Sequence, residues 1–221
     1  MRELAERVRK LRGFPPNVMN VYLVGDVLVD AASRHAARRI LRQLDGRPLA
    51  AHVVTHAHPD HQGATHAVCE RRGAPLWAGE RDADALEDGR IAERQPDHPM
   101  NRLSEWAFAG PPHPVARRLR EGDAVAGFAV LDTPGHSAGH ISLWRESDRT
   151  LLLGDVAFGC NPLTGVPGLH EPPDFFTPHP PRNRESLRRL GELGPALVLF
   201  GHGPPLRDPE RFARFTAALA D

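Results

Sequence analysis

The chain has no long apolar run and very little cysteine. No stretch approaches the roughly 18 consecutive apolar residues that a membrane-spanning helix needs, so nothing predicts a membrane partner. The only two cysteines, Cys69 and Cys160, are too few for a disulfide scaffold and fit a reducing compartment. Residues 1–13 lack the apolar centre of a secretory signal. We therefore expect a cytoplasmic protein.

An excess of one charge is also missing. The sequence has 28 basic and 28 acidic side chains, and its formal net charge is zero. Because nucleic-acid partners usually require a basic surface, this balance argues against them and leaves a small molecule as the expected partner. Lys10 is the only lysine, which we interpret as a bias in composition. The oligomeric state stays open.

Segments typical of strands and helices alternate along the 221 residues, which predicts one α/β domain over residues 1–221. Residues 18–30 are typical of a β-hairpin around Gly25 and Asp26. The further strands are expected at 52–55, 76–77, 128–131, 141–144, 150–153 and 197–200. The helices are expected at 33–45, 63–72, 80–86, 184–193 and 209–219.

Two long segments, 88–114 and 155–182, show no clear period and are rich in proline and in polar residues or glycine. We expect loops with short helical pieces in the first and irregular structure in the second. Irregular segments of this length are usually functional or disordered. Both are therefore candidate lids over a site.

Histidine is abundant, with 13 residues, and it is the commonest metal ligand. The hexapeptide His56-x-His58-x-Asp60-His61 follows a predicted strand. Two imidazoles two residues apart can converge on one cation and leave it strongly Lewis acidic. After the bend at Pro59, the side chains of Asp60 and His61 can face a second cation close by. One loop could supply half the ligands of a two-metal centre.

Three further strand ends offer the remaining ligands. His136 follows a strand and a Pro-Gly turn, Asp155 ends an apolar strand, and His202 stands between two glycines after another strand. A carboxylate has two oxygens, so Asp155 could contact two cations and relieve their repulsion. A neighbouring glycine allows the backbone to approach a metal closely.

These four pieces, in this order, resemble the metallo-β-lactamase superfamily over nearly the whole chain. The resemblance implies a four-layer αββα sandwich with two divalent metal ions at one edge, zinc first and iron or manganese as alternatives. Asp30 matches a structural acid that supports the site in many members. The resemblance assigns His56, His58 and His136 to the first metal, Asp60, His61 and His202 to the second, and Asp155 to both.

The other eight histidines show no pattern that suggests a ligand, and we expect surface or supporting roles for them: His35, His52, His66, His98, His113, His140, His170 and His179. Cys160 is expected to be an inert thiol near the site. For Phe175 and Phe176, lining a substrate pocket and ordinary core packing are both open.

Such a site predicts a hydrolase. A hydroxide shared by two cations can attack a carbonyl carbon, the cations stabilise the oxyanion, and Asp60 can orient the nucleophile or pass a proton to the leaving group. Esters, thioesters and lactams all fit. Exported β-lactamases often have cysteine where this chain has Asp155, and many lactonases of the family have an active-site tyrosine. Here Phe158 follows Asp155 by three residues, and Tyr22 is the only tyrosine. These differences argue against antibiotic hydrolysis as the main role and against that type of lactonase.

Glyoxalase II-like thioesterases share all seven ligands, but they carry a C-terminal helical extension with basic residues that hold glutathione. Only about twenty residues follow His202 here. We therefore expect a glyoxalase II-like hydrolase, and we rank a thioester substrate slightly ahead of other esters. The main alternative is a persulfide dioxygenase with one iron held by His56 or His58, His136 and Asp155; a lactonase is a further one. A non-catalytic binding member ranks last, because no ligand is missing.

Overall fold

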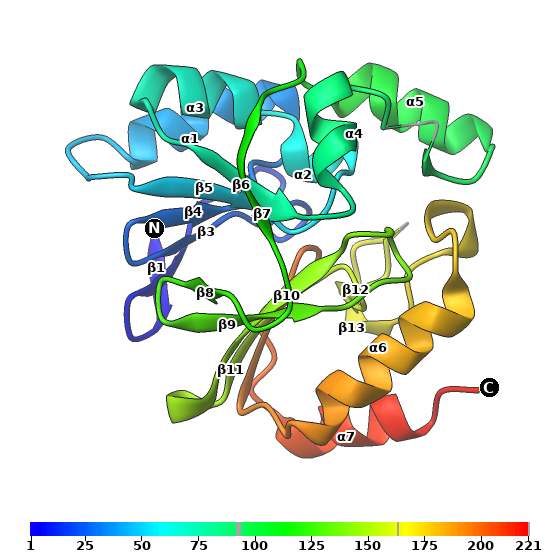
Figure 1. Ribbon diagram of the computed structural model, residues 1–221. Coiled ribbons are helices and arrows are strands. Elements are labelled where there is room, and N and C mark those ends of the chain that lie inside the picture. Colours follow the sequence, from blue (N-terminus) through cyan, green and yellow to red (C-terminus); the bar gives the residue numbers. More distant parts are fainter. Residues whose placement is uncertain (92–93, 163, 221) are drawn as a thin grey trace.

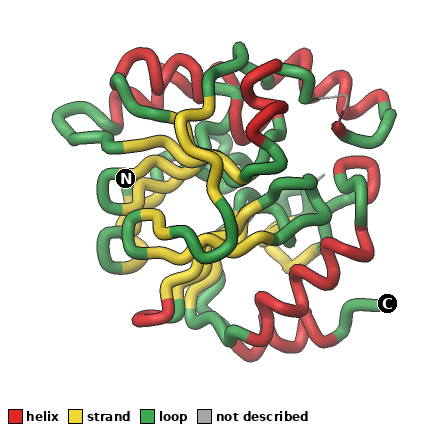
Figure 2. The backbone as a smooth tube through the Cα atoms, in the orientation of Figure 1, coloured by secondary structure: helices red, strands yellow, loops and turns green. Residues whose placement is uncertain are grey.

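A computed structural model describes residues 1–91, 94–162 and 164–220. Two sheets lie face to face between two layers of helices (Figures 1 and 2). This is the αββα arrangement that the resemblance to the metallo-β-lactamase superfamily implies. Residues 92–93 and 163 of the two expected irregular segments, and residue 221 at the end of the predicted domain, lie outside the described residues.

The first sheet runs in chain order from β1 to β7. Its first four strands pair antiparallel, and β4 to β7 pair parallel. The predicted hairpin over residues 18–30 is present as β3 and β4, whereas β1, β2 and β7 were not predicted. The strands are β1 (Arg2–Ala5), β2 (Val8–Lys10), β3 (Tyr22–Val24), β4 (Val27–Val29), β5 (Ala51–Val54), β6 (Leu76–Gly79) and β7 (Val115–Leu119).

The second sheet has the order β14-β11-β10-β9-β8, with β11 and β14 parallel and the other pairs antiparallel. A separate two-stranded pair stands beside it. The strands are β8 (Ala124–Val125), β9 (Phe128–Asp132), β10 (Ile141–Arg145), β11 (Thr150–Gly154) and β14 (Leu197–Phe200), and the pair is β12 (Phe158–Cys160) and β13 (Pro167–His170).

Helices cover the outer face of each sheet. Those beside the first sheet are α1 (Ala37–Gln43), α2 (Pro59–Gln62), α3 (Thr65–Arg72), α4 (Ala83–Asp88) and α5 (Pro99–Phe108), and those beside the second are α6 (Pro180–Glu192) and α7 (Pro209–Ala217). The 3₁₀ turns whose bounds lie within the described residues are η1 (Arg34–Ala36), η3 (Glu146–Asp148) and η4 (Asp174–Phe176). Among the described residues, no helix is both long and apolar enough to cross a membrane.

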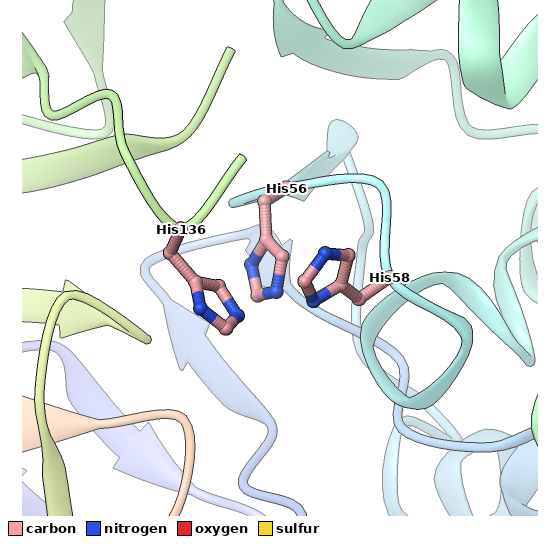
Figure 3. Close-up of side chains that lie close together, drawn as sticks. All are labelled: His56, His58 and His136. Carbon is pink, nitrogen blue, oxygen red and sulfur yellow. The ribbon is translucent and has the colours of Figure 1, made fainter. Parts of the chain in front are cut away.

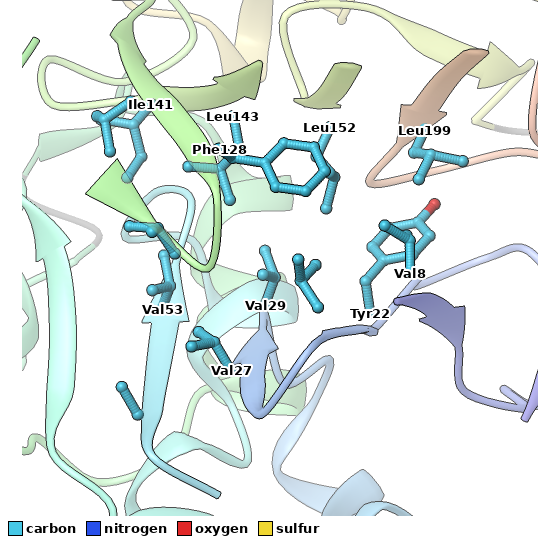
Figure 4. Packing of buried hydrophobic residues seen from close by; sticks show 14 of the residues in the cluster. Val8, Tyr22, Val27, Val29, Val53, Phe128, Ile141, Leu143, Leu152 and Leu199 are labelled. Carbon is cyan, nitrogen blue, oxygen red and sulfur yellow. The ribbon is translucent and has the colours of Figure 1, made fainter. Parts of the chain in front are cut away.

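The main core lies between the two sheets, where the inward side chains of β4 and β5 face those of β9 to β11 (Figure 4). Val29, Val53, Phe128 and Leu143 are all at most 1% exposed. Burial of each such side chain contributes about 1.5–3 kcal/mol relative to exposure. The hydroxyl of Tyr22 donates to the carbonyl of Phe200 at 2.7 Å, so its polar end is satisfied inside the core. This packing holds the ends of both sheets in a fixed relation.

The two expected irregular segments contain more regular structure than predicted. Residues 88–114 include the ten-residue helix α5, with Pro99 in its first turn and the His98 ring accepting from the amide of Met100. Residues 155–182 include β12, β13 and η4. The helical spacing of apolar residues in α5 is weak because its apolar side chains are not all buried: Leu103 and Trp106 are exposed.

Candidate metal centre

Four strand ends bring the predicted ligands to one edge of the sandwich. β5 leads directly into the hexapeptide that starts at His56, while His136, Asp155 and His202 follow β9, β11 and β14. The first strand belongs to one sheet and the other three to the opposite sheet. The site therefore depends on the packing of the two sheets.

Three buried histidines form one group. His56, His58 and His136 come from both sheets, and Figure 3 shows their rings gathered around a common space. The ring centroids of His56 and His58 are 4.4 Å apart, and those of His58 and His136 are 4.5 Å apart. One nitrogen of each ring lies within 4.8 Å of the others, so the three can converge on one cation.

A second group, formed by Asp60, His61 and His202, lies beside the first. The Nε2 atom of His202 is 3.2 Å from Asp60 Oδ2 and 3.3 Å from His61 Nε2. These distances are close to the separation of about 3.3 Å expected between two ligand atoms that share a tetrahedral zinc ion.

Asp155 stands between the two groups. Its Oδ2 atom lies 3.2 Å from His61 Nε2 and 3.0 Å from His202 Nε2. The same oxygen is 3.9 Å from His56 Nε2 and 3.7 Å from His136 Nε2. One carboxylate therefore lies near both groups. All seven residues are brought together.

The local backbone explains why the ligands can approach so closely. Pro59 occupies the first turn of α2, so Asp60 and His61 stand on a short helix that begins directly after His58. A Cβ atom at Gly201 would lie 2.0 Å from Asp155 Oδ1, so any larger residue before His202 would intrude on the Asp155 carboxylate. Glycine is required there by space.

Hydrogen bonds from outside the cluster orient the rings. Asp30 Oδ2 accepts from His61 Nδ1 at 2.9 Å, as expected for a supporting acid. The backbone carbonyl of Val18 accepts from His202 Nδ1. Such partners at one ring nitrogen fix the tautomer and leave the other nitrogen, Nε2, free to bind a metal.

The first group has similar support from threonines that sequence reasoning did not find. Thr55 Oγ1 is 3.0 Å from His56 Nδ1, and Thr177 Oγ1 is 3.2 Å from His136 Nδ1. A threonine carries no pattern in sequence that marks it as a partner of a histidine 41 residues away, as Thr177 is.

Unpaired atoms show that the residues fit a metal. His56 Nε2, His136 Nε2 and Asp155 Oδ1 are buried and have no hydrogen-bond partner among the described residues. Buried polar atoms are nearly always satisfied, and leaving one unpaired costs about 1–3 kcal/mol. Divalent cations coordinated by these atoms would remove that cost.

The carboxylates make the centre favourable for positive charge. Burial, followed by the neighbouring histidines, holds the pKa of His56 well below its usual value, so that ring is neutral. Burial also lowers the pKa of His202, but Asp155 and Asp60 outweigh it and raise the pKa to about 10. The pKa of His61 is raised well above its usual value because Asp155 and Asp30 outweigh burial in the same way.

Asp82 is a further residue of the site that the sequence did not reveal. It is buried at the start of α4, and its carboxylate accepts from the amides of Ala57 at 2.9 Å and Gly139 at 2.6 Å and from the Ser137 hydroxyl at 2.6 Å. Ala57 lies between two predicted ligands, and Ser137 follows a third. Asp82 thus connects the ligand loops of the two sheets.

Two expected supporting histidines are buried. His140 Nε2 accepts from the backbone amide of Asp155 at 3.0 Å. His52 contacts the Leu28 carbonyl and the Thr65 hydroxyl beneath the helices. His66 and His113 instead contact each other outside the centre, with Nδ1 atoms 3.3 Å apart and Glu70 nearby. These three residues form a separate, more exposed group that could hold a cation.

A cavity of about 460 Å³ opens onto the centre, within the range of small-molecule sites. His58, Asp60, His136, Asp155 and His202 line its inner end. Parts of both expected lid segments contribute walls through α5, β12 and η4. Phe176 lines the cavity, whereas the neighbouring Phe175 stacks on His98 with ring centroids 4.8 Å apart.

Comparison with known proteins identifies the family. Residues 15–202 match the model of the metallo-beta-lactamase superfamily. The chain therefore belongs to this superfamily, and it is a metal-dependent hydrolase of that group.

Individual relatives agree with the family. The chain is 29% identical to a probable metallo-hydrolase, YflN, of Bacillus subtilis (strain 168), over 91% of this chain and 86% of the relative. It is 27% identical to a hydroxyacylglutathione hydrolase of Bdellovibrio bacteriovorus, over 69% of this chain but only 48% of that enzyme. The chain thus spans about half the length of that hydrolase.

Solved structures support the fold. The crystal structure of TTHA1623 in a di-iron-bound form has a TM-score of 0.67 and 32% identity, over 89% of this chain and 92% of that one. The metallo-beta-lactamase family protein TTHA1429 from Thermus thermophilus has a TM-score of 0.68 and 26% identity, over 97% of this chain and 80% of that one. The first of these holds iron, so the family relation leaves the metal of this chain open.

Proposed function

We propose that this protein is a binuclear metal-dependent hydrolase that cleaves a thioester or another ester. The observation that carries the proposal is the position of Asp155, whose Oδ2 atom lies within 3.9 Å of histidine nitrogens from both ligand groups. A carboxylate so placed is suited to two cations held close together.

The ligand roles follow the two groups. His56, His58 and His136 would hold the first ion, and Asp155 would contact both. Asp60, His61 and His202 would hold the second ion. A ligand set with more histidine nitrogens than carboxylates suits zinc best, and iron and manganese are the alternatives.

When bound, two divalent cations would lower the pKa of a water molecule and stabilise negative charge on the carbonyl oxygen of the substrate. In the overall reaction, the water oxygen bonds to the carbonyl carbon, and the bond to the leaving sulfur or oxygen breaks. One water proton passes to the leaving atom. The products are a carboxylic acid and a thiol or alcohol.

We assign the transfer of this proton to Asp60. Its carboxylate lines the inner end of the cavity and is 20% exposed, so it faces both the centre and the substrate space. Its Oδ2 atom is 3.2 Å from His202 Nε2, so the two side chains are placed to share the second ion. From there Asp60 can accept a proton from water and return it to the leaving group.

The shape of the second ligand group supports this reaction over its main alternative. A mononuclear persulfide dioxygenase would use two histidines and Asp155 and would leave His202 without a role. Here His202 is within 3.3 Å of Asp60, His61 and Asp155. A lactonase that depends on a tyrosine hydroxyl is also less well supported, because Phe158 lines the cavity instead, with its ring centroid 4.8 Å from that of His202.

The test is hydrolysis by the purified protein of p-nitrophenyl butyrate and of the butyryl thioester of N-acetylcysteamine. We expect turnover of both, loss of turnover after treatment with a chelator, and recovery on addition of zinc, iron or manganese. The same protein should consume no oxygen with glutathione persulfide. Oxygen consumption without ester hydrolysis would overturn the proposal in favour of the dioxygenase.

A further inference from the structure

The cavity over the metal centre has mostly apolar walls. Beyond the predicted ligands, most of its lining side chains are apolar, and eight of them come from four separate places in the chain. These are Val18 and Met19 before β3, Met100, Leu103, Ala107 and Phe108 on α5, Phe158 on β12, and Phe176 on η4.

Positive charge is missing from these walls. Among the described residues that line the cavity, none is lysine or arginine, and the polar ones outside the ligands are neutral, such as Gln95, Ser104 and Asn161. Lys10 is hydrogen-bonded to Asn17 and is not part of the lining. Arg94, next to Gln95, is paired with Asp88.

An anionic substrate arm would therefore meet an unfavourable surface. Glutathione carries two carboxylates, and burial of an unpaired carboxylate against apolar side chains costs far more than burial of a neutral group. A neutral hydrocarbon chain has the opposite preference, gaining about 0.8 kcal/mol for each buried methylene, or on the order of fourfold in binding.

The size of the cavity limits the length of the arm. A space of about 460 Å³ falls in the lower half of the range for small-molecule sites. Part of that space must hold the reacting ester group above Asp155 and His202. The remainder suits an acyl chain of about six to eight carbons.

We infer that the substrate is a thioester or ester with a neutral apolar acyl arm of medium length, which lies between α5 and Phe158 and Phe176. The inference rests on the proposed hydrolase function and specifies its substrate class. Leu103 is the residue of α5 best placed to test it, because it lines the cavity but is 53% exposed, so its replacement should leave the fold intact.

Trp106 provides a matched control on the same helix. It is 73% exposed and does not belong to the cavity lining. Leu103→Glu and Trp106→Glu both replace an exposed apolar residue of α5 by the same charged one, but only the first adds a negative charge at the cavity wall.

The experiment measures kcat/KM for p-nitrophenyl esters with acyl chains of two, four, six and eight carbons, together with the acetyl thioester of glutathione. We expect kcat/KM to rise on the order of fourfold per methylene up to six or eight carbons and to be lowest for the glutathione thioester. Leu103→Glu should lower the value for octanoate at least about tenfold and change that for acetate less than about twofold, and Trp106→Glu should match wild type.

Binding of octanamide, a neutral amide, measured by calorimetry separates the two proposals. If no ester is cleaved but octanamide binds to wild type and not to Leu103→Glu, the substrate arm is supported and the hydrolase function fails. If esters are cleaved without dependence on chain length, or the glutathione thioester is preferred, the hydrolase function stands and the apolar arm is wrong.

Discussion

The carboxylate of Asp82 accepts a hydrogen bond from the hydroxyl of Ser137 at 2.6 Å inside the protein. The same carboxylate holds the amides of Ala57 and Gly139. One side chain thus joins the loop that carries His56 and His58 to the loop that carries His136. The two loops belong to opposite sheets, so Asp82 fixes the distance between ligands that no strand pairing connects.

We therefore predict that Asp82→Asn weakens metal binding and the fold together. The side-chain amide of asparagine would place its own N–H donors where three donors already converge on Asp82, so one buried donor would lose its acceptor. Such an unpaired buried group costs about 1–3 kcal/mol of unfolding free energy. Metal affinity should fall about tenfold or more. Ser137→Ala, which removes one of the donors, should have a smaller effect on both. Unfolding midpoints and metal titration measure this, and an Asp82→Asn variant equal to wild type would refute the positioning role.

A second prediction concerns Asp30, whose carboxylate accepts from His61 Nδ1 at 2.9 Å. Asp30 has a φ of 60°, in the left-handed region, which asparagine tolerates better than alanine. Asp30→Asn therefore isolates the loss of charge from backbone strain. We expect metal affinity to fall about 10–100-fold with the fold intact. Equilibrium metal titration, with circular dichroism as the check on folding, decides this; unchanged affinity would show that His61 needs no charged partner.

A third prediction concerns acid stability. Burial lowers the pKa of His52 to about 4 in the folded chain, against about 6.5 when unfolded. The unfolded state therefore binds more protons between pH 6.5 and 4, so unfolding free energy falls as pH falls through this window. His52 should account for about 3 kcal/mol of that fall.

The measurement is urea unfolding at pH 7 and pH 4.5 for His52→Gln and for His179→Gln, which changes an exposed histidine. The difference in unfolding free energy between the two pH values should shrink in the first variant and stay as in wild type in the second. An equal difference in both would show that the protonation of His52 is not linked to folding.

The family resemblance implied the αββα fold, whereas the seven gathered residues could be picked out from the sequence for a physical reason. Each lies in a short pattern at a strand end, such as Gly-Asp155 or Gly-His202-Gly, and strand ends of packed sheets meet at an edge. Asp82 could not be found in this way, because it lies 25 residues from Ala57 and 55 from Ser137, with no periodicity between them.

Several structural elements were also not predicted from the sequence, and α5 and β7 show why. The helix α5 turns Leu103 towards an open cavity and leaves Trp106 exposed, so its apolar residues do not follow the pattern of a helix packed on a core. Strand β7 contains two adjacent arginines and lies at the edge of its sheet, where side chains face solvent. Such strands lack the apolar run that marks a buried one.

The most direct test of the account is the number of metal ions bound per chain in protein purified without added metal. The account predicts about two ions in wild type, about one or fewer in His58→Ala and in His61→Ala, and two in His179→Ala. Any ion that survives the first two changes but is lost in His66→Ala belongs to the exposed group of His66, Glu70 and His113. A wild-type protein with a single ion, retained in His61→Ala, would contradict the binuclear centre.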